Sequence, residues 1–553
     1  MNTLKDYVNF RLTHADKLAE AKGYPLELYD CKKYKPMRDL KIYGESVQDG
    51  VPTPETPIEV QCVGDKSLNL VKDAREVFKD FSDYTEVEED GRECIRIKSN
   101  SSAKAILDFT FKENTQYTIS FDFKCEYAYS GVSLEYDVPF VVYYTDGNRD
   151  ICNLSPIDNT WNKRVLTTKA GKTVSHISGI SFDYRVYNYI DINTFQIEEG
   201  AVATEYQPYY DGYKIPVVVK GKNLATAYDV CKNLSTYTEI TLDGRECVSY
   251  RSNYGFSYAY TDYPFKENTQ YTVSFYVKSV KNHTLTGNNM IMGFTYTDGT
   301  APTQYNKDCV YNNNDGVNDV EWRKVTITSQ AGKTVKGFGT DGNHYTLTHY
   351  IDVNTFQFEE SATATEYEPY VEPVTTNIFL NEPLCKIGDY ADYIDFKNKK
   401  VVRKTLVQVI KSSKVTGKNS YFTNLGWNGY NYPLTEYPPY SESGYPKEFS
   451  THFKTPKTYN SNHIEEYVFT INNDQKYAYF ITTKASDETV DDFKVFLNQK
   501  EAQGNPVTLY YRLVIPIEEP LNIDIPKLKS KTTIIEVDTS LAPSSVFGKY
   551  IKK

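Results

Sequence analysis

The chain has 553 residues and a formal net charge of −11. This length allows roughly three to five domains of about 100–200 residues, so sizeable apolar cores can form without disulfide support. The acidic balance repels phosphate backbones, and the sequence holds no run of about 18 apolar residues that would predict a membrane span. We therefore expect neither nucleic-acid binding nor membrane insertion.

Tyrosine is unusually frequent, because 50 Tyr stand against 27 Phe and 3 Trp. Tyrosine favours strands and combines an apolar ring with a hydroxyl group. The composition therefore predicts a β-rich protein, and as a sharper alternative some of these rings form recognition surfaces. The nine cysteines are scattered without a Cys-x-x-Cys pair, which predicts packed thiols rather than a disulfide framework.

The N-terminal segment, residues 1–35, is expected to contain a helix over residues 3–22. One helical face carries Leu4, Val8, Leu12, Ala15 and Ala19. This spacing suits either a coiled-coil seam or a helix packed on a domain, and both alternatives stay open. The first residues lack the apolar run of a signal peptide, which predicts synthesis in a cytoplasm without secretion. Residues 36–64 are expected to form a β linker interrupted by prolines.

The next two segments, 65–210 and 211–372, repeat the same short sequences in the same order. Asp90-Gly-Arg-Glu-Cys94 recurs at 243–247, and Phe111-Lys-Glu-Asn-Thr-Gln-Tyr-Thr118 recurs at 265–272. Each copy runs about 150 residues, far longer than a solenoid repeat, so each is a whole domain. The sequence therefore predicts one fold copied twice, with insertions in its loops.

Both copies show the alternation of half-buried strands. Apolar and polar residues alternate along 117–123 and again along 271–277, and Asp-Gly pairs at 146–147 and 298–299 mark turns. Short strands divided by such turns predict antiparallel β-sandwiches, and we favour a jelly roll. The expected fold class is mostly β, with tandem jelly-roll-like β-sandwich domains, a short N-terminal helix and a C-terminal β-rich domain.

The last segment, residues 373–553, is expected to be this further β domain. Its apolar residues alternate with polar ones over 507–513. One helix is predicted over 488–499, with Ser486 or Asp487 as its N-cap.

The sequence contains no convincing pattern of catalytic or metal-binding residues. Ala170-Gly-Lys-Thr173 resembles the end of a phosphate-binding loop, but Leu166 stands where that motif needs glycine, so we interpret it as a turn. The adjacent Glu198 and Glu199 face opposite ways on a strand, which favours structural or solvated roles. His344 and His349 are expected in a surface loop. We expect no enzyme activity and no cofactor, with a structural calcium ion in the modules as the minority alternative.

Aromatic residues are the better candidates for binding. Trp161 and Trp322 recur at matching places, which favours packing over a ligand platform. Candidate ligand residues lie where the copies differ, because loops vary while cores persist. Aromatic faces beside polar groups suit carbohydrate. The candidates are Tyr127, Tyr129, Tyr184 and Tyr187 in the first copy, Tyr254, Phe256, Tyr258, Tyr260 and Tyr345 in the second, and Trp427 and Tyr430 in the C-terminal domain.

Three stretches carry a resemblance to a known family. They are Leu40-Lys-Ile-Tyr-Gly-Glu-Ser-Val-Gln-Asp-Gly-Val-Pro-Thr-Pro-Glu-Thr-Pro-Ile-Glu-Val60, the end of the first repeat at 195–209, and residues 384–403 with 493–497 and 505–513. Together they resemble tail and baseplate appendage proteins of phages and prophages of low-GC Gram-positive bacteria. The resemblance implies a virion protein that attaches to host-surface glycan, is commonly trimeric, and has other tail or baseplate proteins as partners. It supplies no ligand-binding residues.

Three functions remain in contention. The first is a phage tail or baseplate appendage that binds host-surface polysaccharide through its sandwich modules. The second is a purely structural virion component, such as a spacer, decoration or fibre, without a receptor site. The third is a glycan depolymerase, which the absence of a candidate acid/base pair disfavours.

Overall fold

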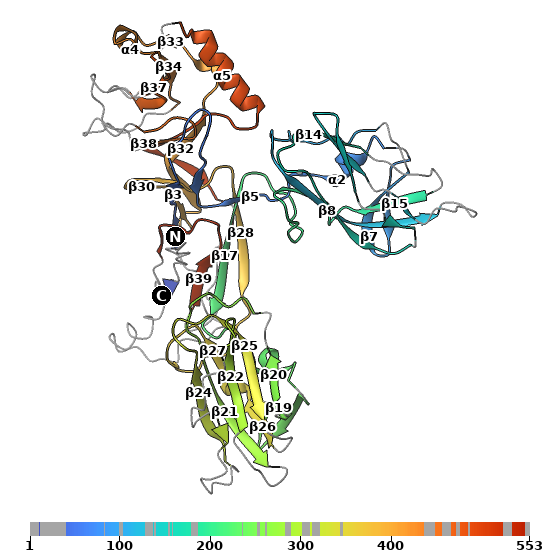
Figure 1. Cartoon of the computed structure of the whole chain (residues 1–553). Coiled ribbons are helices and arrows are strands. Elements are labelled where there is room, and N and C mark those ends of the chain that lie inside the picture. Colours follow the sequence, from blue (N-terminus) through green and yellow to red (C-terminus); the bar gives the residue numbers. More distant parts are fainter. Residues whose placement is uncertain are drawn as a thin grey trace.

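A computed structural model describes most of the chain (Figure 1). The description covers residues 10–11 and 40–547, apart from 82, 99–102, 128–135, 138–139, 153–154, 158, 179–185, 235, 252–254, 260–262, 282–288, 301–309, 312–320, 343–346, 436–447, 456–465, 472–475, 485–486, 522 and 524–532. Within these ranges, no helix has both the length and the apolar character needed to cross a membrane.

Strands from distant stretches of the chain build a central body. Its first sheet has the order β1-β39-β17-β28, with β5 also paired to β17, and its second has the order β35-β38-β32-β31-β2-β40. The strands are β1 Phe10–Arg11, β2 Lys41–Tyr43, β5 Asp65–Lys66, β17 Tyr213–Gly221, β28 Val374–Leu380, β31 Tyr393–Asp395, β32 Lys400–Val409, β35 Phe449–Ser450, β38 Thr508–Pro520, β39 Thr533–Val537 and β40 Ser545–Phe547. Two hairpins complete the body: β3 Ser46–Gln48 with β4 Val60–Cys62, and β29 Lys386–Ile387 with β30 Tyr390–Ala391.

The central body changes the expected domain layout. The strands expected in 36–64 are present, but β2 pairs with β31 and β40 near the other end of the chain. Strand β17, at the start of the range expected for the second module, pairs with β28 and β39. Buried apolar residues from all these strands share one core, among them Ile42, Ile215 and Ile535. The two repeated modules are therefore insertions into loops of the central body.

The N-terminal helix expected over residues 3–22 lies mostly outside the described residues. Of that segment only Phe10–Arg11 is described, as strand β1, which pairs antiparallel with β39.

Each module has its own core between two antiparallel sheets. In the first module one sheet has the order β13-β8-β15-β7-β6, with β16 beside β8, and the other has the order β11-β10-β14. Its elements are α2 Ala74–Phe78, β6 Thr85–Glu89, β7 Arg92–Ile97, β8 Tyr117–Tyr127, β9 Tyr136–Asp137, β10 Val141–Tyr144, β11 Arg149–Ile151, β12 Ser155–Pro156, β13 Asn162–Thr167, β14 Val174–Ser178, β15 Val186–Asp191 and β16 Gln196–Glu199.

The second module repeats this plan. Its sheets have the orders β18-β19-β26-β21-β24, with β27 beside β21, and β20-β25-β22-β23. Its elements are α3 Ala227–Cys231, β18 Thr238–Leu242, β19 Arg245–Arg251, β20 Gly255–Ala259, β21 Thr272–Lys281, β22 Asn289–Tyr296, β23 Val310–Tyr311, β24 Arg323–Thr328, β25 Val335–Gly342, β26 Leu347–Asp352, η4 Val353–Thr355 and β27 Gln357–Glu359. Figure 1 shows this module at the far end of β17 and β28, away from the first.

The strand order confirms the jelly-roll prediction. From β19 to β26 the chain crosses repeatedly between the two sheets, so that strands adjacent in sequence seldom pair. Double-sheet Greek-key connectivity of this kind defines a jelly roll. The predicted apolar face is confirmed, because Tyr117, Ile119 and Phe121 are buried in one module and Tyr271, Val273 and Phe275 in the other. The prediction that the opposite face is exposed is wrong for this part of the strands, because Thr118, Ser120, Thr272 and Ser274 are buried as well.

The C-terminal lobe adds a small sheet and a helix to the ends of β32 and β38. The sheet contains β33 Gly417–Lys418, β34 Gly429–Pro433, β37 Tyr477–Ile481 and β36 Val468–Ile471, and the helical elements are η5 Ser412–Lys414, α4 Ser420–Asn424 and α5 Val490–Ala502. Helix α5 is the predicted one, and its Phe493 and Leu497 are buried. Its N-cap is Thr489 rather than Ser486 or Asp487, because Thr489 and Asp492 form a reciprocal capping box.

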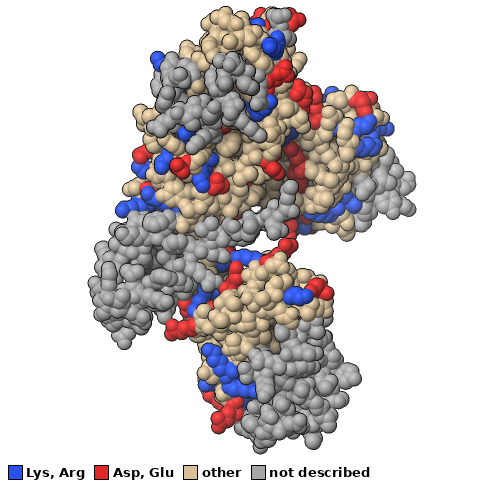
Figure 2. Space-filling model, turned by 60° about the vertical axis from the view of Figure 1, so that its left-hand side comes forward, with Lys and Arg blue, Asp and Glu red and all other residues tan. Residues whose placement is uncertain are grey.

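The charged side chains do not separate into regions of one sign on the face drawn in Figure 2. Among the described residues of that face, blue and red atoms lie interspersed. That face therefore offers no extended basic track.

The recurring Ala-Gly-Lys-Thr sequences are turns, as predicted, and the structure shows why they recur. Lys172 Nζ donates to Asp146 of the Tyr-Thr-Asp-Gly turn in the first module, and Lys333 Nζ donates to Asp298 in the second. Each ion pair therefore ties two turns of one module together. The hydrogen bond from Lys172, helped by those from Asn148, lowers the pKa of Asp146 to about 2.

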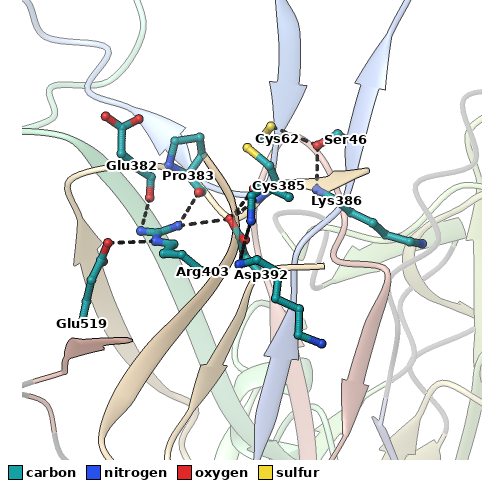
Figure 3. Close-up of polar contacts among 11 residues, drawn as sticks. Ser46, Cys62, Glu382, Pro383, Cys385, Lys386, Asp392, Arg403 and Glu519 are labelled. Carbon is teal, nitrogen blue, oxygen red and sulfur yellow. Dashed lines mark hydrogen bonds and ion pairs between the residues drawn. The ribbon is translucent and has the colours of Figure 1, made fainter. Parts of the chain in front are cut away.

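A buried carboxylate holds the central body together (Figure 3). The register between β32 and β38 shifts between Arg403 and Thr405, which frees backbone amides from the ladder. Asp392 Oδ1 accepts from the amides of Lys404 at 2.7 Å and Thr405 at 2.8 Å, and Oδ2 accepts from the amide of Cys385 at 3.1 Å. Arg403 lies 3.6 Å away as its counter-charge. Asp392 thus satisfies amides from two different segments of the chain.

We predict that Asp392→Ala destabilises the central body by about 3–5 kcal/mol. The substitution leaves Arg403 without its buried partner and leaves three backbone amides without an acceptor. Calorimetry of the full chain should show an earlier transition. Asp389→Ala, an exposed turn residue nearby, is the matched control and should melt like the parent. Equal melting of the two variants would contradict this role.

We predict that Asp146 titrates near pH 2 and that Lys172→Met raises its pKa toward the ordinary value of about 3.9. Because the folded-state pKa is lowered, the stabilisation is present above about pH 4 and is lost as the pH falls toward 2. Carboxyl NMR titration measures this directly. Lys333→Met, the equivalent change in the second module, should leave Asp146 unchanged. An Asp146 that titrates near 4 in the parent chain would refute the prediction.

Candidate ligand-binding face of the two modules

A tight hairpin turn begins the candidate site in both modules. In the first module β6 and β7 are joined by Asp90 and Gly91, which have positive φ angles of 51° and 75°. Asp243 and Gly244 repeat these values between β18 and β19. Two consecutive positive φ angles define the two-residue turn that Asp-Gly favours. The turn directs each aspartate toward the tryptophan that precedes the edge strand of the same sheet.

The half-buried Trp161 is held by groups from three parts of the first module. Its Nε1 donates to Asp90 Oδ2 at 2.9 Å, and the Arg92 guanidinium lies 4.7 Å from the ring centroid. Arg92 in turn donates to Asp122 at 2.6 Å and Asp191 at 3.0 Å. An indole fixed at one edge and covered by a guanidinium has little freedom to rotate.

A buried lysine extends this arrangement along the outer face of the sheet. Lys124 is 1 % exposed, and its Nζ donates to Asp90 at 2.8 Å and Glu89 at 2.5 Å. The same Nζ lies 5.8 Å from the centroid of Trp161 and 5.4 Å from that of Tyr189. Aromatic rings and fixed charges therefore alternate across strands β13, β8 and β15.

The second module repeats this set of contacts. Trp322 Nε1 donates to Asp243 Oδ2 at 3.2 Å, and Arg245 lies 4.9 Å from the Trp322 centroid. Lys278 donates to Asp243 at 2.6 Å, and Arg245 donates to Asp352 at 2.6 Å. We call these residues the Trp–Arg cluster: Asp90, Arg92, Lys124, Trp161 and Asp191 in the first module, and Asp243, Arg245, Lys278, Trp322 and Asp352 in the second.

The surroundings of the cluster differ between the modules. By strand register, Tyr276 stands where the first module has Asp122, and the Arg245 guanidinium lies 5.8 Å from its ring. The neighbouring face of the second module also exposes apolar Val280 and Ile240. The two faces share one centre but offer different chemistry around it.

Hydrogen bonds hold the cluster in its charged state. The bond from Lys124, followed by that from Trp161, lowers the pKa of Asp90. Lys278 and then Trp322 lower the pKa of Asp243 in the same way. The hydrogen bond to Asp122 raises the pKa of Arg92. The cluster therefore keeps fixed charges across the neutral range. A half-buried aromatic ring beside fixed donors and acceptors suits a ligand with apolar faces and hydroxyl groups.

Two predicted ligand residues of the first module are described. Tyr187 is half-buried on the same outer face as Tyr189, with Arg96 4.8 Å and Lys98 5.1 Å from its ring centroid. Tyr127 is 43 % exposed at the end of β8. Tyr129 and Tyr184 lie outside the described residues. Of the two described candidates, Tyr187 shares the outer face with Tyr189, whose ring contacts Lys124 of the cluster.

In the second module the predicted ligand side chains lie outside the described part of the structure. Phe256 and Tyr258 lie in β20, and the structure describes their backbone alone. Tyr254, Tyr260 and Tyr345 lie outside the described residues.

The two candidates in the C-terminal lobe have different environments. Trp427 is half-buried, with Lys484 Nζ 5.9 Å from its ring. The prediction for Tyr430 is wrong, because its side chain is fully buried and stacks on Phe493 with ring centroids 4.4 Å apart. A cavity of about 310 Å³ in this lobe is lined instead by residues that include Phe453, Tyr467 and Glu488.

Sequence reasoning missed the charged members of the cluster. The signal was present, because Asp-Gly-Arg-Glu-Cys and the tryptophan both recur. The contact between them could not be predicted from the sequence, since Trp161 lies 71 positions after Asp90 and only the sheet register brings the two together.

The recurring glutamates have structural roles, as predicted. The buried Glu198 accepts hydrogen bonds from Gln196 at 2.9 Å and from the amide and hydroxyl of Thr204 at 2.9 and 2.8 Å. Glu359 repeats this arrangement with Gln357 and Thr365. No group of three or more His, Cys, Asp or Glu side chains suited to a metal ion occurs in the described part of the chain.

The prediction of a surface loop for His349 is wrong. His349 lies in β26, is fully buried, and its Nδ1 is 2.8 Å from Ser279 Oγ. Burial, and then the charge of Arg323, lowers its pKa to about 3. His344 lies outside the described residues.

The described residues thus define a mostly β protein with two antiparallel jelly-roll modules that carry the same Trp–Arg cluster. No family model and no curated protein matches the chain. Among solved structures, the N-terminal CBM22-1–CBM22-2 tandem domain of Xyn10C from Paenibacillus barcinonensis matches at 14 % identity and a TM-score of 0.24, over 54 % of this chain and 98 % of that one. A similarity at this score supports no inference about function.

Proposed function

We propose that this chain is an attachment protein of a phage tail or baseplate, which binds host-surface saccharide through the outer sheet faces of its two modules. The observation that carries the proposal is the repeated half-buried tryptophan. The same two partners, an aspartate and an arginine, hold it in both modules, although the surrounding faces have diverged.

The chemistry of the face favours a saccharide over other ligands. Sugars present apolar C–H faces that pack on aromatic rings, and hydroxyl groups that bond to fixed charges. Trp161 and Tyr187 supply half-buried rings on one sheet face, and the cluster supplies the charges. A peptide partner would more often use an unpaired sheet edge or an apolar groove.

The arrangement of the modules supports a role in presentation. Each module has a separate apolar core and is inserted into the central body through short connections. Figure 1 shows the two modules directed away from one another. Two sites carried by one chain can bind a polymer jointly, which raises overall avidity.

A structural role is the second candidate, and one observation favours it. Every cation of the cluster already has a carboxylate partner, so the cluster can stabilise the module without a ligand. In that case the modules are spacers, and loss of the tryptophan lowers stability without changing binding.

We predict that the full-length protein binds cells or wall polysaccharide of a low-GC Gram-positive host saturably, with competition by free sugar. Trp161→Ala combined with Trp322→Ala should weaken binding by at least about tenfold, equivalent to about 1.4 kcal/mol. Binding to immobilised polysaccharide, measured by interferometry, gives the ratio.

Trp427→Ala removes the third tryptophan, which lies outside both modules, and is the matched control. It should bind like the parent. Parent-like binding by the double variant would exclude the cluster as the site. Absence of binding by the parent over a broad host panel, with earlier melting of the double variant, would favour the structural role.

A further inference from the structure

Two cysteines of the central body face each other across an antiparallel pairing. Val63 donates its amide to the Leu384 carbonyl at 3.1 Å, and Leu384 donates to the Val63 carbonyl at 2.9 Å. Residues that exchange both bonds form a hydrogen-bonded pair, so the next pair outward, Cys62 and Cys385, is a directly opposed pair without backbone bonds. At such positions the Cα atoms lie about 4.5 Å apart, at the short end of the range that a disulfide spans.

The two thiols also contact each other. Burial, and then the neighbouring Cys62 side chain, raises the pKa of Cys385, and Figure 3 shows the two sulfur atoms side by side. Cys94 and Cys247 differ, because each of their thiols donates to a backbone carbonyl at 3.3 Å.

Both cysteines are held in place by their neighbours. Ser46 Oγ accepts from the Lys386 amide at 2.8 Å and lies 3.2 Å from Cys62 Sγ, which leaves the Ser46 proton available to the sulfur. The Cys385 amide donates to the buried Asp392. A bond between the sulfurs therefore needs little movement of either strand.

A small oxidant can reach Cys62. This residue is 9 % exposed and lines a cavity of about 390 Å³, together with Gly64, Tyr213 and Tyr510. Cys385 is fully buried behind it.

We propose that Cys62 and Cys385 are a disulfide-forming pair that closes when the protein meets an oxidising environment. With hydrogen peroxide as oxidant, the Cys62 sulfur first takes one peroxide oxygen to become a sulfenic acid, and water is released. The Cys385 sulfur then attacks the Cys62 sulfur. The S–S bond forms, the S–O bond breaks, and a second water leaves with the Cys385 proton. The two thiols are oxidised by two electrons and the peroxide is reduced to two waters.

The bridge would join the two ends of a very long loop. Both modules lie in the chain between Cys62 and Cys385, so the disulfide would close the central body beneath both insertions. In the chain-entropy account, the stabilisation from a disulfide grows with the length of the loop that it closes. The inference does not depend on saccharide binding, and it concerns a part of the molecule away from the Trp–Arg cluster.

The experiment uses full-length protein that has been reduced, desalted and incubated with or without dilute hydrogen peroxide. Each sample is denatured in an alkylating reagent, and the products are analysed by intact mass and non-reducing peptide mapping. We expect the oxidised protein to lose two hydrogen atoms, to yield one linked peptide containing Cys62 and Cys385, and to melt later than the reduced protein. Burial raises the pKa of Cys385, so the linked fraction should accumulate faster at higher pH.

Cys62→Ser and Cys385→Ser should each abolish the linked peptide, and Cys125→Ser, a buried cysteine of the first module, should not. Folding of each variant is checked by circular dichroism, and the parent chain alone is sufficient if a variant misfolds. Full alkylation of Cys62 and Cys385 in the oxidised parent, or linkage of either one to a different cysteine, would overturn the proposal.

Discussion

The carboxylate of Asp392 is the interaction on which the central body depends. A buried charge is costly, and here the cost is offset by three backbone amides, the Thr405 hydroxyl and the Arg403 guanidinium. Arg403 also donates to the carbonyls of Glu382 and Pro383 and to the carboxylate of Glu519, so one ion pair connects β28, β32 and β38. The Gly44 amide donates to the Asp392 carbonyl, which attaches the N-terminal strands as well. Two modules can be inserted into this body because segments far apart in the sequence are fixed at one point.

In both modules, a shared set of side-chain hydrogen bonds fixes the segment through which the chain leaves the module. After the last strand of each sandwich, a buried glutamate and a glutamine accept the amides of the segment that leaves the module. This segment then returns to the central body. The exit from each module is therefore set within the module, and each core can be satisfied without contacts from the other. Such independence is what allows one jelly roll to be duplicated without disturbing its host.

The sequence predicted the modules well and the central body poorly, for physical reasons. Strands such as Tyr117–Tyr127 can be predicted from the local alternation of apolar and polar residues, and the duplication shows where the repeated unit begins and ends. The pairing of strands in the central body leaves no pattern in the local sequence. Strand β17 pairs with β28 and β39, which lie about 160 and 320 residues further along the chain. Tyr430 was mistaken for a surface residue because its Tyr/Pro/Gly-rich surroundings are typical of loops, whereas it packs in a strand against helix α5. The cluster around Trp161 joins residues from separate strands, and its register cannot be read from one strand alone.

A residue pattern that recurs in both modules can have either a structural or a functional role, and the Trp–Arg cluster illustrates the difference. The turns that pair Lys172 with Asp146 recur because they stabilise a hairpin, and no exposed aromatic ring is needed there. The Trp–Arg cluster contains ion pairs that would also suffice alone: Lys124 with Asp90 and Glu89, and Arg92 with Asp191. A half-buried indole also leaves apolar surface in contact with water. Its presence at the centre of two otherwise divergent faces is the feature on which the proposal of ligand contact rests.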